Sequence, residues 1–245
     1  MHETVTARLR VRRVVTTREG GVSDGPYDSF NLGAHVGDRA ANVAANRDRL
    51  AHELGLAPGR LVWMEQVHGR TVEVVDGPRG EPVPVTDGLV TAVPGLAVVV
   101  LVADCVPVLL ADPVSGVVAA VHAGRVGARL GVLPAALAAM QQAGADIGEI
   151  EALLGPAACG LCYEVPAAMR DDVEAHLPGS ACRTRRGTAA LDLRAGLAEQ
   201  LSAAGIARIG ADPRCTLEDR ELYSHRREGT TGRIAALTWV EAAPQ

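Results

Sequence analysis

The residues that decide the fold run from 97 to 122 and read AVVVLVADCVPVLLADPVSGVVAAVH. Three apolar runs rich in β-branched residues, at 97–102, 106–110 and 117–121, are separated by short turn sequences. The turn residues between the last two runs, Asp112-Pro113 and Ser115-Gly116, indicate a hairpin-like reversal. We therefore expect three closely spaced strands in the middle of the chain.

Helical patterns follow this centre. A helix is expected from about Gly127 to Met140, and Pro134 is expected to kink it or to delay its start. Two more helices are predicted over 166–177 and 192–204, the second with Asp192 as its N-cap.

The segment before the centre mixes both kinds of element. Leu9–Val15 alternates arginine with aliphatic residues, as in a strand with one solvated face, and Asp38 can cap a helix that ends at Gly55. Strands are expected over 61–64 and 71–75. Because strands and helices are mixed without strict βαβ alternation, the sequence predicts a mixed α+β fold in one domain spanning residues 1–245.

Composition excludes several classes of function. The chain has 245 residues, a net charge of −5 and 48% hydrophobic residues, so we expect a globular protein that binds neither nucleic acid nor an anionic membrane. All 24 basic residues are arginine, which excludes a Schiff-base lysine and a P-loop ending in Gly-Lys-Ser/Thr. Six aromatic residues leave few surfaces on which bases could stack.

The cysteines indicate a reducing compartment. Their number, five, is odd, and residues 1–20 contain five arginines and no apolar signal core. The longest apolar stretch, about Gly95 to Ala103, is far shorter than the ~20 residues of a membrane span. We expect a cytoplasmic protein with free thiols or metal-bound cysteines.

Three side chains of metal-ligand type stand at strand ends or beside glycine turns. His68 lies in Gln-Val-His-Gly, Cys105 in Ala-Asp-Cys-Val-Pro, and His122 in Ala-Val-His-Ala-Gly. Two imidazoles and one thiolate form a catalytic zinc set with a position open for water or substrate. The same residues also fit a cysteine nucleophile, in which His122 activates Cys105 and Asp104 is the residue that orients the histidine. The residues alone leave both readings open.

Other histidines and cysteines carry weaker signals. Cys159-x-x-Cys162 has no second cysteine pair, so ordinary buried thiols are expected there. The zinc-deaminase signature, His-x-Glu with Pro-Cys-x-x-Cys, does not occur. His35, His52 and His176 are expected at the surface or in packing.

Two polar segments could hold an anion. The first comprises Thr17–Gly21 and Asn31–Gly33, and the second is the arginine-rich segment Tyr223–Arg233. Paired arginines with hydroxyls and glycine amides can bind phosphate bidentately, although a solvated loop would have the same composition.

Together these motifs resemble the bacterial laccase-domain or YfiH-like family, whose members are also called peptidoglycan editing factors or polyphenol oxidases and are regarded as zinc-dependent purine nucleoside phosphorylases. The matching segments occur in order from about residue 13 to residue 240, which makes the set specific. They are Thr17-Arg18-x-Gly20-Gly21, Asn31-Leu32-Gly33, Asn46-Arg47, Gln66-Val67-His68-Gly69, Thr86-Asp87-Gly88, Ala103-Asp104-Cys105-Val106-Pro107-Val108, Val121-His122-Ala123-Gly124, Leu154-Gly155-Pro156, Cys215-Thr216 and Ser224-His225-Arg226-Arg227 with Thr231-Gly232-Arg233.

The resemblance implies an α/β/β/α layered sandwich and zinc (Zn²⁺) on His68, Cys105 and His122, with copper (Cu²⁺) as the alternative. It implies phosphorolysis of adenosine, inosine, guanosine or methylthioadenosine, with adenosine deamination as a side activity. Phosphate and purine nucleosides are thus the implied partners, and three further residues become candidates for phosphate or ribose contacts: Arg18, Asn31 and Arg226.

One departure from the family pattern concerns the metal loop. The family usually has tryptophan after His-Ala-Gly, whereas this chain has Arg125, which affects the expected selectivity for the purine and not metal binding. A multicopper site would need many more imidazoles than the five histidines left beside His68 and His122, so we exclude that architecture. A cysteine amidase that edits peptidoglycan precursors and a non-catalytic zinc-binding protein remain as alternatives.

Overall fold

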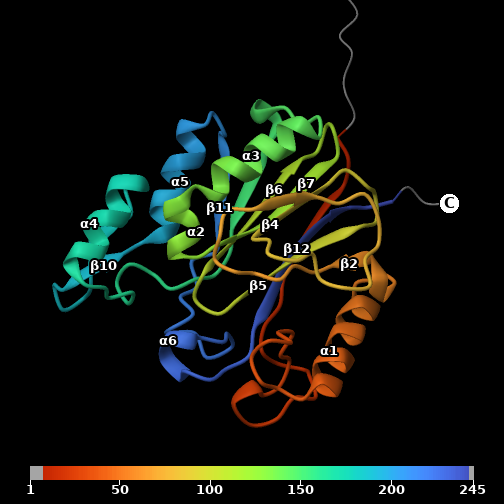
Figure 1. Cartoon of the computed structure of the whole chain (residues 1–245), viewed down its shortest axis with the longest axis horizontal. Helices are drawn as coiled ribbons and strands as arrows, with labels where there is room; N and C mark the ends of the chain where they lie inside the picture. Colours follow the sequence, from red (N-terminus) through yellow and green to blue (C-terminus); the bar gives the residue numbers. More distant parts are fainter. Residues whose placement is uncertain (1–7, 243–245) are drawn as a thin grey trace, which may run out of the picture.

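Two β-sheets pack face to face at the centre of the protein, whose computed structural model describes residues 8–242 (Figure 1). One sheet has six strands and the other four, and helices cover the outer face of each. The layers are therefore α/β/β/α, as expected. The ends of the predicted 1–245 domain, residues 1–7 and 243–245, lie outside the described residues.

The sheets combine parallel and antiparallel pairs. The six-stranded sheet has the order β11 (Arg208–Ala211), β8 (Glu151–Leu154), β6 (Val106–Asp112), β7 (Val117–Ala123), β4 (Gly88–Thr91) and β3 (Val72–Val74). The four-stranded sheet has the order β1 (Val11–Val15), β12 (Ile234–Val240), β5 (Ala97–Val102) and β2 (Leu61–Val62). A separate hairpin pairs β9 (Ala181–Arg183) with β10 (Ala189–Leu191).

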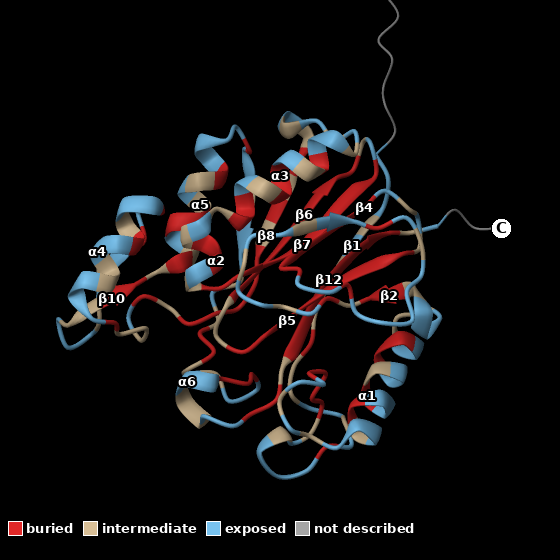
Figure 2. Ribbon diagram, in the orientation of Figure 1, coloured by how far each residue is buried: buried red, intermediate tan, exposed pale blue. Residues whose placement is uncertain are grey.

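Alternating side chains explain why the central strands are apolar at nearly every position. In β6, Val108 and Leu110 pack toward the helices, whereas Leu109 and Ala111 pack toward the other sheet. Since successive strand residues point to opposite faces, a strand covered on both sides needs apolar residues throughout. Figure 2 shows β6 and β7 buried along their length, in agreement with the fully buried pattern of both strands.

Helices close the two outer faces. On the four-stranded sheet, α1 (Ala40–Glu53) buries Leu50 and Ala51 against β5 and β12. The six-stranded sheet is covered by α3 (Val132–Gln142) and α5 (Leu193–Ala203), with α2 (Arg125–Leu130) and α4 (Ala167–His176) beside them. The last short helix is α6 (His225–Glu228), and single 3₁₀ turns lie at Gly25–Tyr27, Pro58–Arg60 and Ile147–Glu149. None of the helices in residues 8–242 is long and apolar enough to span a bilayer.

Two helix boundaries differ from the sequence-based expectation. The single helix predicted over 127–140 is two helices, broken at Gly131 and not at Pro134, because Gly131 adopts a left-handed conformation with φ of +86°. Pro134 lies in the first turn of α3, where a missing amide costs nothing. Asp38 does not cap α1; the N-cap is Arg39, and Asp38 instead bonds to Ser23 and Asn31.

The break between α2 and α3 gives a test of this geometry. We expect Gly131→Ala to lower the free energy of unfolding by about 1 kcal/mol, because an L-residue pays a steric cost in the left-handed region. A Cβ there would come no closer than 4.0 Å to Pro134, so the cost is confined to the backbone. Urea denaturation measures it. The matched control is Gly148→Ala, at an exposed glycine outside the positive-φ set, and equal stability of both variants would contradict the break.

Candidate active site

His68, Cys105 and His122 converge at one end of the sheets. Their ligand atoms all lie within 4.8 Å of one another, with 3.8 Å between Cys105 Sγ and His68 Nε2. The hairpin of β6 and β7 brings two of them together: it pairs Val106 with Ala123, the residues next to Cys105 and His122. His68 arrives from the loop between β2 and β3.

Asp87 fixes the positions of both histidines. Its carboxylate is fully buried just before β4 and accepts hydrogen bonds from the backbone amides of Val67 (3.3 Å), His68 (2.9 Å) and Gly69 (2.6 Å). The same carboxylate binds Nδ1 of His122 at 2.8 Å. One buried anion therefore holds the His68 loop, in which His68 itself has a φ of +59°, and sets the orientation of the His122 ring.

This arrangement fits a metal ion. In the neutral imidazole, with Nδ1 of His122 donating to Asp87, Nε2 carries the lone pair that can bind a cation. Gly124 makes room for the group, since a Cβ at that position would lie 2.9 Å from His68 Cδ2 and 3.0 Å from Cys105 Sγ. The donor set and the carboxylate behind one histidine are both typical of zinc sites.

The electrostatics favour a thiolate at Cys105. Burial alone would raise the pKa of this thiol, but the neighbouring imidazoles of His122 and His68 outweigh burial and lower the pKa to about 6. Burial would likewise lower the pKa of His122, whereas the Cys105 thiolate and Asp87 raise it to about 9. A thiolate is the form of cysteine that binds metal or acts as a nucleophile.

A cavity of about 310 Å³ opens beside these three residues. Three arginines line it, namely Arg125, Arg226 and Arg233, and Tyr163 forms part of the wall. The guanidinium of Arg226 lies 5.0 Å from the centroid of the Tyr163 ring. The lining also includes His35, Gln66, Leu101, Val102, Ala103, Asp104, Leu193 and His225. The cavity thus places several positive charges near the three candidate metal ligands.

Of the predicted phosphate or ribose contacts, the structure places Arg226 in the cavity wall. Arg18 and Asn31 are not among the described residues that line this cavity. Arg18 donates to Glu228 at 2.9 Å, and Asn31 is fully buried and accepts from the backbone amide of Arg233 at 2.9 Å. Both side chains support the loops around the cavity, and direct contact with substrate by either stays a prediction.

The expectation that Asp104 orients His122 is wrong. Asp87 performs that task, and the Asp104 carboxylate instead accepts from Thr216 Oγ1 and from the amide of Arg226, both at 2.6 Å. In the sequence, Asp87 stands only in the Thr86-Asp87-Gly88 segment, which assigns it no role. Its position between a loop and a buried strand was the signal available, but its partners come together only in three dimensions.

Glu228 anchors the arginine-rich segment and gives a pH-dependent test. Burial opposes its ionisation, but hydrogen bonds from Thr231, Arg227 and Arg18 outweigh burial and lower its pKa from 4.5 to about 2. Because the folded-state pKa is depressed, the stabilisation is present above the unfolded pKa and is lost as the pH falls from about 4.5 to about 2.

We expect Glu228→Gln to lower the free energy of unfolding near neutral pH, where the carboxylate is ionised and bonded. Most of this difference from the wild type should disappear near pH 2 to 3, roughly where the wild-type carboxylate becomes protonated. Free energies of unfolding measured at both pH values test this. Glu53→Gln, in an exposed pair with Arg49, is the control and should change stability little at either pH. A Glu228→Gln effect independent of pH would contradict the assignment.

Comparisons with known proteins identify the family of the chain. A family model described as multi-copper polyphenol oxidoreductase laccase matches residues 12–241. A purine nucleoside phosphorylase of Mycobacterium tuberculosis is 58% identical over 239 residues, covering 98% of this chain and 96% of the relative. Another protein of that name, from Corynebacterium glutamicum, is 57% identical over 232 residues and covers 94% of each chain.

Solved structures show the same architecture. YlmD from Geobacillus stearothermophilus superposes with a TM-score of 0.89 at 35% identity, covering 95% of this chain and 92% of that one. YfiH from Bacillus licheniformis gives a TM-score of 0.88 at 31% identity, covering 94% and 93%. The chain therefore belongs to the laccase-like YfiH family, whose model carries the multi-copper polyphenol oxidoreductase description.

Proposed function

We propose that this protein is a zinc-dependent purine nucleoside phosphorylase. It would cleave adenosine, inosine, guanosine or methylthioadenosine with phosphate and release the base and the sugar 1-phosphate. The observation that carries the proposal is the cationic cavity beside a two-histidine, one-cysteine ligand set. The relatives named purine nucleoside phosphorylase, which align over nearly the whole chain, support it.

His68, Cys105 and His122 would hold the zinc ion. When bound, zinc supplies a Lewis acid that polarises an oxygen or nitrogen atom of the substrate. Among the described residues, these three form the only histidine-containing group of three or more clustered ligand side chains. That favours a mononuclear site over a multicopper arrangement, which needs further clustered imidazoles.

The arginines suit the second substrate. Arg125, Arg226 and Arg233 line one cavity and can bind a phosphate dianion through charge-assisted, bidentate hydrogen bonds. In phosphorolysis, a phosphate oxygen bonds to the anomeric carbon while the glycosidic C–N bond breaks and the base leaves with its bonding electrons. Fixed guanidinium groups would hold the nucleophile in place and would cost no reorganisation during the reaction.

Arg125 bears on the choice of base. It opens α2, directly after Gly124, and lies in the cavity wall with Tyr163. A guanidinium stacks on a flat ring and also donates hydrogen bonds, so it would recognise purines differently from the indole usual in the family. Adenosine deamination is the side activity that the family resemblance implies, and the cytoplasm is the proposed location.

One observation keeps a cysteine amidase as the second candidate. A nucleophilic triad needs a thiol, a base beside it and a carboxylate that orients the base. Here the thiol is Cys105, the base is His122 and the carboxylate is Asp87. The amidase mechanism does not use His68, although Nε2 of His68 lies 3.8 Å from the Cys105 sulfur. Two imidazoles on one thiolate favour the metal site.

The test is incubation of metal-analysed protein with adenosine, with and without phosphate, while adenine, inosine and ribose 1-phosphate are followed. We expect adenine release that requires phosphate and disappears in His122→Ala and after chelation. Inosine formation would report the deaminase activity. Absence of nucleoside turnover by zinc-loaded protein would overturn the proposal, and peptide-bond hydrolysis that survives chelation would favour the amidase.

Asp87 supplies a separate test of the metal site. We expect Asp87→Asn to weaken zinc binding roughly 10- to 100-fold, because the charge that orients and polarises His122 is lost. Competition with a chromophoric chelator measures the affinity. The matched control is Asp112→Asn, another buried aspartate that accepts backbone amides, here at the end of β6. Equal zinc affinity in both variants would show that Asp87 plays no part in metal binding.

A further inference from the structure

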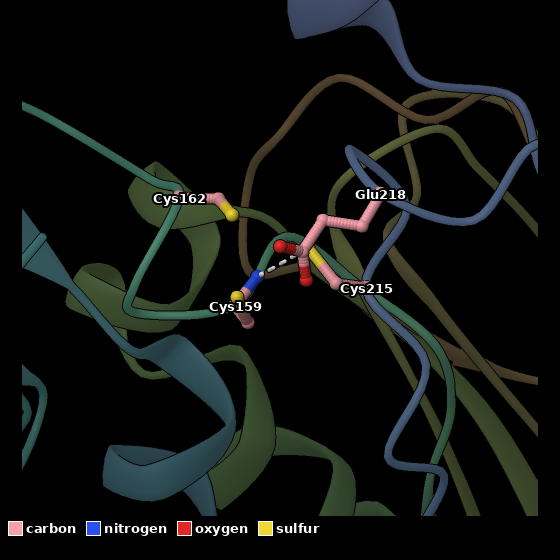
Figure 3. A group of neighbouring side chains, drawn as sticks. All are labelled: Cys159, Cys162, Cys215 and Glu218. Atoms are coloured by element: carbon pink, nitrogen blue, oxygen red, sulfur yellow. Dashed lines mark hydrogen bonds between the residues drawn. The ribbon is translucent and has the colours of Figure 1, made fainter. Parts of the chain in front are cut away.

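A second group of ligand side chains lies outside the cavity lining. It consists of Cys159, Cys162, Cys215 and Glu218, whose sulfur and carboxylate oxygen atoms all lie within 4.8 Å of one another. Figure 3 shows the four side chains converging from two segments. Cys159 and Cys162 lie in the loop after β8, and the other two lie in the loop between β11 and α6.

The spacing of these atoms suits one tetrahedral ion. Atoms bound to zinc at about 2.3 Å at the corners of a tetrahedron stand roughly 3.8 Å apart, so only a small contraction of the group is required. Cys-x-x-Cys supplies two ligands from one short loop, which is the usual half of a structural zinc site. The sequence offered no second pair, and the structure supplies Cys215, 56 residues after Cys159.

The surroundings suit an anionic metal centre. The backbone amide of Cys159 donates to Cys215 Sγ at 3.4 Å, the dashed line in Figure 3. The guanidinium of Arg185 donates to Cys162 Sγ at 3.5 Å and pairs with Glu218. Three thiolates and one carboxylate carry four negative charges, zinc brings two positive charges, and Arg185 offsets part of the remainder. Amide and guanidinium donors to sulfur stabilise such a centre.

We propose that Cys159, Cys162, Cys215 and Glu218 bind a structural zinc ion, separate from the candidate ion on His68, Cys105 and His122. Thiolates select zinc over hard cations, and four protein ligands leave no open position for substrate, as in structural sites. Cys182 is not part of the group; its thiol points to the carbonyl oxygen of Gly160 at 3.4 Å.

The ion would join the two loops that form one wall of the cavity. Tyr163 follows Cys162 directly and lines the cavity, and α6, which bears Arg226, follows the loop of Cys215 and Glu218. Thr216, next to Cys215, donates to Asp104, the residue before Cys105. A metal link between the loops thereby stabilises the wall without touching the substrate.

Metal analysis of the purified full-length protein tests the proposal. With reductant and excess zinc followed by desalting, we expect two zinc ions per chain in the wild type. One ion is expected in Cys162→Ser and also in His122→Ala, because each removes a different site. Cys182→Ser is the matched control, a nearby half-buried cysteine outside the group, and should keep two. A wild-type content of one that Cys162→Ser leaves unchanged would overturn the proposal.

Cobalt substitution separates the two sites by their sulfur content. The cobalt form of His122→Ala keeps only the site with three thiolates, so it should show an intense sulfur-to-metal charge-transfer band. The cobalt form of Cys162→Ser keeps only the site with the single thiolate of Cys105, so this band should be much weaker. If Cys162→Ser fails to fold, Glu218→Gln replaces an exposed ligand without disturbing the core, and it should release the ion to a chelator sooner than the wild type. A disulfide between Cys159 and Cys162 in protein purified under reducing conditions would also overturn the proposal.

These results are independent of the proposed reaction. If the wild type binds two ions and does not cleave nucleosides, the phosphorylase proposal fails and the second site stands. If phosphorolysis depends on zinc and Cys162→Ser retains the full metal content, the second site fails and the phosphorylase proposal stands.

Discussion

The buried Asp87 carboxylate is the interaction on which the site depends. It accepts hydrogen bonds from three backbone amides of the Val67–Gly69 turn and from one ring nitrogen of His122. These donors replace the water molecules that the carboxylate loses when it is buried. Without this anion the three amides of the turn would lose their partner, and the positive φ of His68 would lose the hydrogen bond that restrains it. The Asp87 carboxylate therefore positions two of the three ligands without being a ligand itself. The pairing of β4 with β7 keeps this carboxylate next to His122.

Much of the fold could be predicted from local sequence because the central strands are buried on both faces. A run such as 106–112 has no polar face that could make its pattern ambiguous, and the turn at Asp112–Gly116 sets the hairpin. The end of α2 was harder to predict. Pro134 and Gly131 both interrupt a helical pattern, and only the backbone angle shows that the glycine breaks the helix while the proline sits harmlessly in the next first turn.

The candidate ligands were visible in sequence because each stands where a buried segment meets the surface. Cys105 precedes β6 and His122 lies near the end of β7, so the strand pattern itself places them at one edge. Residues that act through a partner were not visible in this way. Asp87 depends on a loop 20 positions earlier, and Cys215 completes a group begun 56 positions earlier, so neither has a local periodicity to reveal it.

Asp104 shows how the two ligand groups are mechanically connected. It has a φ of +91°, a conformation that costs an aspartate free energy and persists only where its surroundings hold it. Those surroundings are the Thr216 hydroxyl and the Arg226 amide, one beside the second cysteine group and the other at the start of α6. Because Cys105 follows Asp104 directly, the position of its sulfur depends on these loops. An ion that fixes Cys215 would therefore restrain Cys105 through Thr216 and Asp104, which gives the distant cysteines a physical reason to be present.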